Sequence, residues 1–266
     1  MSEQSLYAPP RVVTDINQCY FYHTMDLPGY GRVKGEWDLR GREAQYLGGI
    51  SLKGKRVLEV GTASGFLCFY MEKQGAQVVA YDLSPDQQWD IVPYSKLGDA
   101  QHQKNLEDRK QLIAKLNNGY WLAHRVNQSQ ARVVYGSVYE IPEGIGEVDI
   151  AVFGSVLLHL RDPLLALQRV AKLTRETVVV ADTAGPLRLL DRLARGLGRR
   201  MPALTFRPNY RVCEPTETWW NLSPSFVERV LGMLGFENIR TTYSRHRFLE
   251  TEVPLYTVVA HRAKRF

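Results

Sequence analysis

Residues 55–83 read KRVLEVGTASGFLCFYMEKQGAQVVAYDL and decide the fold. The stretch opens with a short apolar run of the kind that a buried parallel strand needs. A turn of small residues follows at 61–65, then helical spacing over 66–74 and a second β-rich run over 77–81 that ends on Asp82. This order predicts a βαβ unit that binds an adenosine-containing cofactor, because glycines let the backbone approach the ligand and the acid accepts hydrogen bonds from ribose hydroxyls.

The glycine spacing of this turn indicates which cofactor to expect. A dinucleotide-binding turn reads GxGxxG and holds the pyrophosphate at a helix N-terminus. Here only Gly61 and Gly65 occur, and Glu59 lies two residues before the first glycine. A carboxylate there would repel a pyrophosphate but suits a cofactor that carries a sulfonium and an ammonium. The pattern therefore favours S-adenosylmethionine (SAM), with a plain strand-to-helix turn as the other interpretation.

The same residues resemble motif I, E/D-x-G-x-G-x-G, of the class I SAM-dependent methyltransferases, with Ala63 in place of the middle glycine. In those families, a hydroxyl or acidic residue in the loop after the third strand pairs with the adenine amine, and an apolar neighbour covers the ring. Ser137 and Val138 are the candidates here. The resemblance implies a cofactor site made by Glu59, Gly61, Thr62, Gly65, Asp82, Leu83, Ser137, Val138 and Ser155.

Length and composition set the broad class. A chain of 266 residues is long enough for one large α/β domain, or for one core with a cap. No apolar run approaches the roughly 20 residues of a membrane span, and the first residues lack the apolar segment of a signal peptide. The three cysteines are scattered and form no metal-binding or disulfide pattern. We expect a cytoplasmic protein without a metal site.

The chain divides by composition into a core and additions. Residues 1–54 precede the first core strand and predict an N-terminal flap over the cofactor face. Residues 55–266 form the predicted SAM-binding core. Insertions interrupt the core at about 86–130, with a helix over 100–117, and at about 184–221. An insertion at the carboxyl ends of parallel strands could cover the substrate, although a surface insertion without a role at the site fits the pattern equally well.

Basic residues gather in the later part of the chain. Residues 161–266 carry a net charge of +8, against −2 for residues 1–160. Within them, residues 187–201 read as a basic amphipathic helix, which could rest on RNA phosphates, on a membrane surface or simply on the protein core. The charge alone does not choose among these partners.

The remaining pattern predicts the α/β class with a Rossmann-like class I methyltransferase fold. The sheet is expected to have seven strands, mostly parallel, to carry helical cap insertions and to end in an antiparallel hairpin of 238–243 and 255–261. Asp162-Pro163 and Ser223-Pro224 read as helix starts. Segments such as YHTMDLPG, WDLR, VYEIP, LLHLRDPLLAL and LGMLGF resemble, in this order, the tRNA wobble-uridine 5-oxyacetate (carboxy)methyltransferases. That resemblance implies transfer of a methyl group from SAM, or of a carboxymethyl group from carboxy-SAM.

Methyl transfer needs an aligned nucleophile and, for a hydroxyl or amine, a base with a pKa near neutrality. His159, just beyond the fourth core strand, and His23, in the flap, are the candidate catalytic residues. Either histidine could instead have a structural role. Tyr22, Tyr139 and Trp219 are candidates for the acceptor pocket.

Three functions remain open. The first is a SAM-dependent methyltransferase that acts on an oxygen or nitrogen of a small metabolite, as in natural-product or glycan tailoring, and releases S-adenosylhomocysteine (SAH). The second is a tRNA wobble-uridine (carboxy)methyltransferase, and the third is a non-catalytic partner protein that keeps the SAM-binding fold.

Overall fold

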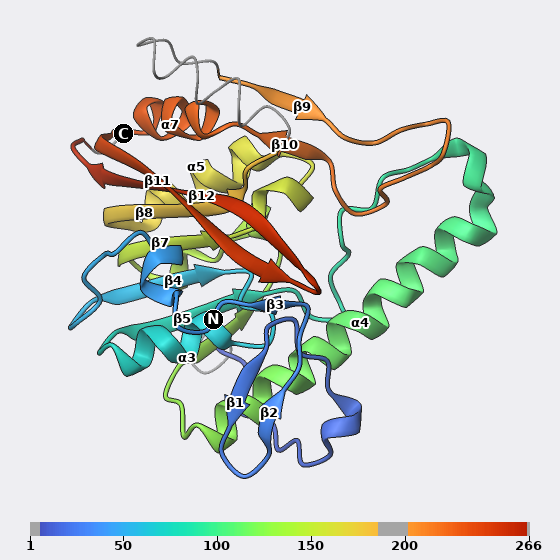
Figure 1. Ribbon diagram of the computed structural model, residues 1–266, viewed down its shortest axis with the longest axis horizontal. Coiled ribbons are helices and arrows are strands. Elements are labelled where there is room, and N and C mark those ends of the chain that lie inside the picture. Colours follow the sequence, from blue (N-terminus) through green and yellow to red (C-terminus); the bar gives the residue numbers. More distant parts are fainter. Residues whose placement is uncertain (1–5, 186–201, 265–266) are drawn as a thin grey trace.

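A computed structural model describes residues 6–185 and 202–264 (Figure 1). Its centre is an eight-stranded sheet in the order β3-β11-β12-β8-β7-β4-β5-β6. The strands are β3 (Trp37–Asp38), β4 (Arg56–Val60), β5 (Gln77–Asp82), β6 (Arg132–Tyr135), β7 (Val148–Gly154), β8 (Thr174–Thr183), β11 (Phe236–Phe248) and β12 (Thr251–Arg262). The predicted fold class is confirmed, and the short edge strand β3 adds to the seven strands expected.

Five neighbouring strands are parallel, and the last two are not. β8, β7, β4, β5 and β6 run in one direction, while β12 pairs antiparallel with β8, and β11 antiparallel with β12. The chain builds outward from β4 through β5 to β6, then returns to β7 on the other side of β4. The strand order therefore reverses between β4 and β7, and open α/β sheets bind ligands at the carboxyl ends of the strands at such a point.

Helices cover both faces of the sheet (Figure 1). Successive residues of a strand point to opposite faces, so Val57 packs in the cluster that includes α3 and α4, and Leu58 packs in the cluster that includes α5 and α7. The helices are α2 (Glu43–Tyr46), α3 (Phe66–Lys73), α4 (Gly98–Val126), α5 (Pro163–Leu173) and α7 (Pro224–Met233). Short 3₁₀ turns are η1 (Ile16–Gln18), η2 (Ser95–Leu97), η3 (Val138–Glu140), η4 (Glu143–Ile145) and η5 (Leu157–His159).

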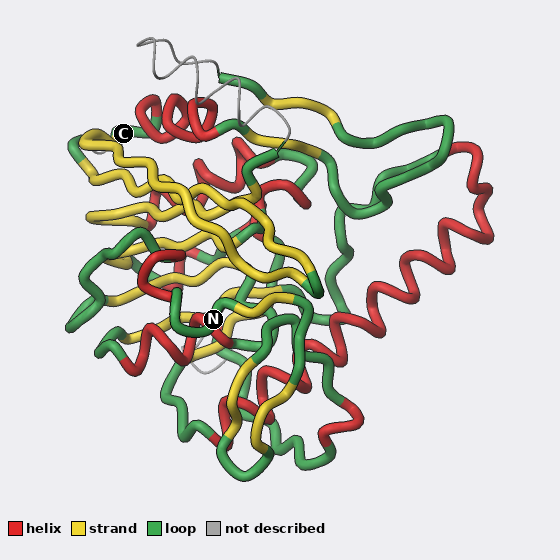
Figure 2. Tube along the Cα trace, viewed as in Figure 1, coloured by secondary structure: helices red, strands yellow, loops and turns green. Residues whose placement is uncertain are grey.

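Both predicted helix caps are present. The Asp162 carboxylate accepts a hydrogen bond from the Leu165 amide at 2.9 Å, and the Ser223 hydroxyl accepts one from the Phe226 amide at 3.2 Å. The helix expected over 100–117 is longer, since α4 is one continuous helix of 29 residues. Its second half is buried on the sheet, and its first half extends beyond the sheet (Figure 2).

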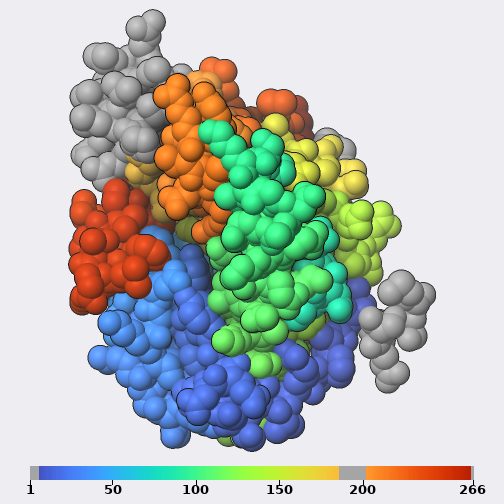
Figure 3. All heavy atoms as spheres, turned by 90° about the vertical axis from the view of Figure 1, so that its right-hand side faces the viewer, coloured from blue at the N-terminus to red at the C-terminus, as the bar shows by residue number. Residues whose placement is uncertain are grey.

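Two insertions meet above the carboxyl ends of the strands. The first, expected at about 86–130, consists of the loop after β5 and helix α4. The second, expected at about 184–221, contains β9 (Leu204–Phe206), which pairs antiparallel with β10 (Trp220–Leu222). The Val92 amide donates to the Thr216 carbonyl at 2.8 Å, and the Trp219 indole donates to the Asp90 carbonyl at 2.7 Å. Figure 3 shows the second insertion, in orange, lying against the first half of α4, in green. The helix predicted at 187–201 lies outside the described residues.

The N-terminal segment closes the remaining side. It contains an antiparallel hairpin of β1 (Met25–Leu27) and β2 (Gly31–Val33). Before the hairpin, the Tyr20 amide donates a hydrogen bond to the Lys115 carbonyl of α4 at 2.9 Å. None of the helices in residues 6–185 and 202–264 is both long and apolar enough to cross a membrane.

Candidate active site

A cavity of about 580 Å³ lies where the strand order reverses. Its volume falls within the roughly 300–1,000 Å³ of small-molecule sites. The sheet side of the wall is made by the turn after β4, the end of β5 with the loop that follows, and the loops after β6 and β7. The middle of α4, the N-terminal segment, part of the second insertion and the β11–β12 hairpin complete the lining. The lining includes Tyr20, Tyr22, His23, Glu36, Trp37, Gly61, Ala63, Asp82, Leu83, Trp89, Asp90, Arg109, Ile113, Leu116, Asn117, Ser137, Val138, Tyr139, Ser155, Leu158, His159, Leu160, Glu217, Thr218, Phe248 and Val253.

The glycine turn presents backbone to the cavity. Gly61 has a φ of +78°, and a Cβ there would lie 2.3 Å from Val156 Cγ2, so only glycine fits without a shift. Ala63 also has a positive φ, of 49°, and its amide donates to the Asp82 carboxylate at 2.6 Å. The acid at the end of β5 therefore holds the turn after β4 in a conformation that an alanine rarely adopts.

Asp82 lies on the cavity wall and joins two strands. One carboxylate oxygen accepts from Ala63, and the other accepts from the Leu83 amide at 2.7 Å. Burial raises the pKa of Asp82 to about 6, because the cost of desolvation outweighs these two hydrogen bonds. The side chain is therefore mainly a carboxylate at neutral pH, and lone pairs remain that can accept further hydrogen bonds.

Three of the sequence-predicted cofactor residues do not line the cavity: Glu59, Thr62 and Gly65. Glu59 is buried, on the face of β4 that looks toward α3 and α4, and its carboxylate accepts a hydrogen bond from the Thr62 hydroxyl at 2.6 Å. Burial raises the pKa of Glu59 to about 8, so it is mostly neutral at pH 7. In this structure Glu59 contacts the glycine turn rather than the cavity, and its contact with a cofactor stays a prediction.

Gly65 has a local structural reason to be glycine. It precedes α3 with a φ of +87°, and a Cβ would lie 2.5 Å from the Phe69 ring and 2.9 Å from the Tyr120 ring. The residue therefore permits close packing of α3 and α4 behind the turn.

The other expected cofactor residues lie on the wall. Leu83, Ser137, Val138 and Ser155 all line the cavity. Ser137 caps the η3 turn by accepting from the Tyr139 amide at 3.3 Å. Ser155 has a φ of +54° and its hydroxyl lies 3.4 Å from the buried Tyr46 hydroxyl. The structure thus brings together, at one edge of the sheet, residues that lie up to 72 positions apart in the sequence.

His159 ends the η5 turn with one ring nitrogen engaged. Its Nδ1 lies 2.6 Å from the Glu217 carbonyl oxygen, and its ring meets the Trp89 ring edge-on at 6.1 Å between centroids. A carbonyl only accepts, so we assign the ring proton to Nδ1, which leaves a lone pair on Nε2. Burial lowers the pKa of His159, which keeps the ring neutral at pH 7.

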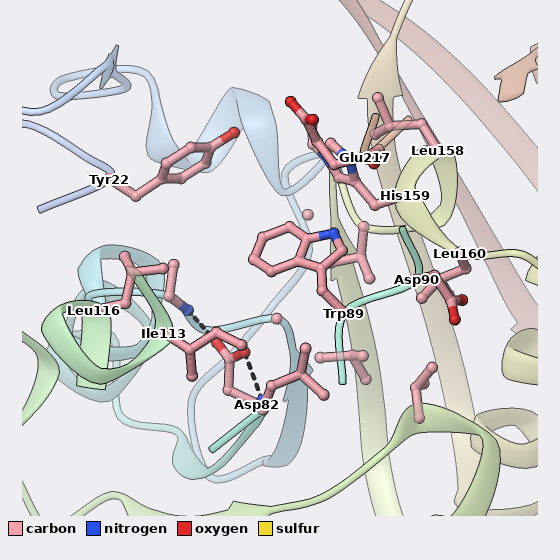
Figure 4. Close-up of a pocket in the computed structure, with 18 of the residues that line it drawn as sticks. Tyr22, Asp82, Trp89, Asp90, Ile113, Leu116, Leu158, His159, Leu160 and Glu217 are labelled. Carbon is pink, nitrogen blue, oxygen red and sulfur yellow. Dashed lines mark hydrogen bonds between the residues drawn. The ribbon is translucent and has the colours of Figure 1, made fainter. Parts of the chain in front are cut away.

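Figure 4 shows how these groups are arranged. Trp89 is drawn between Asp82 on one side and His159 and Glu217 on the other, and Tyr22 directs its hydroxyl across the cavity toward the side of Glu217.

His23 also lines the cavity, and its ring is packed against aromatic residues. Its ring stacks on Phe66 at 5.7 Å and meets Tyr22 edge-on at 5.2 Å. Burial lowers the pKa of His23 to about 4, and among the described residues its Nδ1 has no hydrogen-bond partner. A group with such a low pKa holds a proton poorly at neutral pH.

Several lining residues carry no recognisable sequence signal. Glu36, Trp89, Arg109 and Glu217 come from four separate segments and belong to no motif. Of the three aromatic candidates from the sequence, Tyr22 and Tyr139 line the cavity. Trp219 instead packs in the cluster that joins the two insertions.

Comparison with known proteins identifies the family. The model of a family described as a methyltransferase domain matches residues 34–240 of the 266. The chain belongs to this methyltransferase family. The match confirms the predicted enzyme class, and it does not single out the enzymes of tRNA wobble uridine. No curated protein matches the sequence.

Solved structures with a similar arrangement are also methyltransferases. Magnesium protoporphyrin IX methyltransferase of Synechocystis PCC 6803, with bound SAH, is 14% identical over 83% of this chain and 80% of that chain, with a TM-score of 0.49. The 1,6-didemethyltoxoflavin-N1-methyltransferase of Burkholderia thailandensis is 14% identical over 84% and 78%, with a TM-score of 0.49. The N-methyltransferase NodS of Bradyrhizobium japonicum is 12% identical over 85% and 87%, with a TM-score of 0.48.

Proposed function

We propose that this family member uses SAM to methylate an oxygen or nitrogen atom of a small metabolite. The observation that carries the proposal is one cavity that holds both kinds of group such a reaction needs. The acid and glycine turn that suit adenosine lie on one side of it, and a neutral histidine whose Nε2 carries the ring lone pair lies on the other. Hereafter the wall around Gly61, Asp82 and Ser137 is the cofactor half, and the wall around Glu36, Arg109, His159 and Glu217 is the acceptor half.

The cofactor half fits SAM by its chemistry. Asp82 is an acceptor for the two ribose hydroxyls, and Gly61 lines the cavity without a side chain of its own. Val138 is the apolar neighbour for an adenine ring, and Ser137 is a polar one. When bound, SAM supplies a methyl group made electrophilic by its sulfonium.

The acceptor half supports SAM rather than carboxy-SAM. Arg109 is the only lysine or arginine among the described residues that line the cavity. Its guanidinium is already paired with the Glu217 carboxylate at 3.1 Å. A cofactor carboxylate would have to displace Glu217 before it met this positive charge, which makes the neutral methyl group of SAM the better fit.

The protein's own part in the reaction is to orient the acceptor and to receive its proton. The Glu217 carbonyl fixes the His159 tautomer, so that Nε2 can accept a proton from a hydroxyl or an ammonium. The two insertions and the N-terminal segment cover the strand ends, which limits the access of water to the reacting atoms.

Calorimetric titration of the protein with SAM and with SAH tests the proposal. We expect binding of both, because product and cofactor share the adenosine and amino acid parts. Absence of heat with either ligand, confirmed by an unchanged melting temperature, would refute the proposal and favour a non-catalytic partner protein.

One surface observation favours tRNA as a second candidate acceptor. Phe206 and Tyr210 on the second insertion are exposed by 59% and 67%, and the Lys96 ammonium and the Arg211 guanidinium lie 5.5 and 5.8 Å from the centre of the Tyr210 ring. Aromatic and basic side chains together suit single-stranded RNA. A tRNA enzyme should bind tRNA with an affinity that falls steeply between 50 and 200 mM salt, on the order of 10³-fold or more. Weak binding at both salt concentrations would leave the small metabolite as the acceptor.

A further inference from the structure

Glu36 places a carboxylate in the acceptor half with no cation beside it. Its oxygen accepts a hydrogen bond from the Tyr20 hydroxyl, and within residues 6–185 and 202–264 it forms no ion pair. A neutral hydroxyl does not cancel a negative charge. Glu36 is half-buried, and a ligand that covers its carboxylate removes water from it, which is costly unless the ligand brings a compensating charge.

Arg109 does not supply that charge. Its guanidinium bonds to the Glu217 carboxylate at 3.1 Å and lies 5.6 Å from the centre of the Trp89 ring. Arg109 and Glu217 therefore cancel each other, and the Glu36 carboxylate stays without a counter-charge. Both histidines of the cavity have pKa values lowered by burial and add no positive charge at neutral pH.

Aromatic rings surround the same region. Tyr20, Tyr22, Trp37 and Phe248 line this part of the cavity, and the Trp37 and Phe248 rings pack at 4.8 Å. The negative face of an aromatic ring attracts an organic cation, by about 0.5–2 kcal/mol depending on exposure. Rings and an unpaired carboxylate together recognise an ammonium on an apolar skeleton, whereas rings alone would serve any apolar molecule.

We propose that the methyl acceptor is an amine that binds as its ammonium form, with the nitrogen near Glu36 and the carbon skeleton against the aromatic rings. The proposal rests on the proposed function and narrows its acceptor from oxygen or nitrogen to nitrogen. An anionic acceptor would meet Glu36 and Glu217, and a neutral alcohol would leave Glu36 without a counter-charge.

A histidine on the wall of the same cavity can take the proton that this reaction releases. The bound ammonium loses one proton to Nε2 of His159, which becomes an imidazolium and later releases the proton to solvent. The neutral amine then forms the N–C bond while the C–S bond breaks, and the electron pair of that bond stays on sulfur. The products are SAH and an N-methylated ammonium, with no other reactant required.

Three probes of similar shape and different charge test the inference on the protein saturated with SAH: 2-phenylethylamine, 2-phenylethanol and 3-phenylpropanoate. Calorimetry should show the amine binding about tenfold or more tighter than the alcohol, with the acid weakest. Glu36→Gln should bring the amine to within about twofold of the alcohol. The matched control is Glu237→Gln, which changes an exposed glutamate on β11 and should leave all three affinities unchanged.

The outcomes separate this inference from the proposed function. If SAH binds but the amine binds no better than the alcohol, or not at all, the acceptor assignment fails and the methyltransferase proposal stands. The acceptor assignment also fails if Glu36→Gln leaves the amine preference intact. If SAH does not bind, the proposed function itself fails.

Discussion

Asp82 provides the sharpest test of the cofactor site, because it does two tasks that different substitutions separate. It accepts hydrogen bonds from the Ala63 and Leu83 amides at 2.6 and 2.7 Å, and it lies on the wall where ribose hydroxyls would bind. Asp82→Ala removes both tasks. Asp82→Asn keeps one oxygen as an acceptor and removes the charge.

The expected losses follow from these contacts. Leaving a buried donor unpaired costs about 1–3 kcal/mol, so we expect Asp82→Ala to lower the free energy of unfolding by about 2 kcal/mol. Loss of charge-assisted hydrogen bonds to the ribose should weaken SAH binding by a further 1.5–3 kcal/mol or so, which is about 10- to 150-fold in Kd. Asp82→Asn should lie between the wild type and Asp82→Ala in both quantities.

The pH dependence gives an independent measurement. The pKa of Asp82 in the free protein is about 6, and the ionised form is the one that accepts hydrogen bonds. SAH affinity should therefore be full above that pKa and should fall about tenfold between pH 7 and pH 5, as the carboxylate takes up a proton. Asp82→Asn has no such group and should show a flat profile over this range.

Calorimetry with SAH from pH 5 to 8 and urea unfolding measure these effects. Asp86→Asn is the matched control, since Asp86 is exposed four residues further along the chain. SAH affinity of Asp82→Ala within twofold of the wild type, at every pH, would remove Asp82 from the cofactor site.

Three further predictions address the base, the buried acid behind the turn and the contact between the insertions. His159→Ala should lower turnover by about 10²–10⁴-fold while SAH affinity stays within about twofold. Burial lowers the pKa of His159, so the wild-type enzyme should stay active somewhat below pH 6.5 and lose activity at lower pH, as the ring takes up a proton. An unchanged rate in this variant would assign His159 to structure alone. The pKa of Glu59, about 8, lies above its ordinary value, so its contribution to stability is present at low pH and declines between pH 4.5 and 8. In urea unfolding, the free energy of unfolding of Glu59→Gln minus that of the wild type should therefore increase from pH 5 to pH 8. A difference in unfolding free energy that does not vary with pH would contradict a buried, protonated Glu59. Trp219→Ala removes the largest side chain of the cluster that joins the insertions. It should lower the free energy of unfolding by about 3 kcal/mol and speed proteolysis near Val92. Proteolysis at the wild-type rate would show that this cluster does not hold the insertions together.

The sequence was a good guide to the central unit because its signals are local. The apolar run of β4, the turn with Gly61 and the acid at the end of β5 lie within 29 residues, and each needs only its neighbours to be interpreted. The helix starts at Asp162 and Ser223 are equally local, since a cap forms within one turn of a helix.

Glu59 shows where local interpretation stops. Its position before the glycine turn indicated contact with the cofactor, yet the alternation of side chains along β4 directs it to the face covered by α3 and α4. Which face of a strand meets the ligand depends on where the helices pack, and the motif does not contain that information.

The sequence by itself determined the fold class and the turn that joins Gly61 to Asp82, because these follow from residues close together in the chain, and it made His159 a candidate. Only the tertiary structure decided the acceptor half. Glu36, Trp89, Arg109 and Glu217 meet because the N-terminal segment, the first half of α4 and the two insertions converge over the strand ends. The charges that select an acceptor are set by that long-range packing, and no spacing along the chain records it.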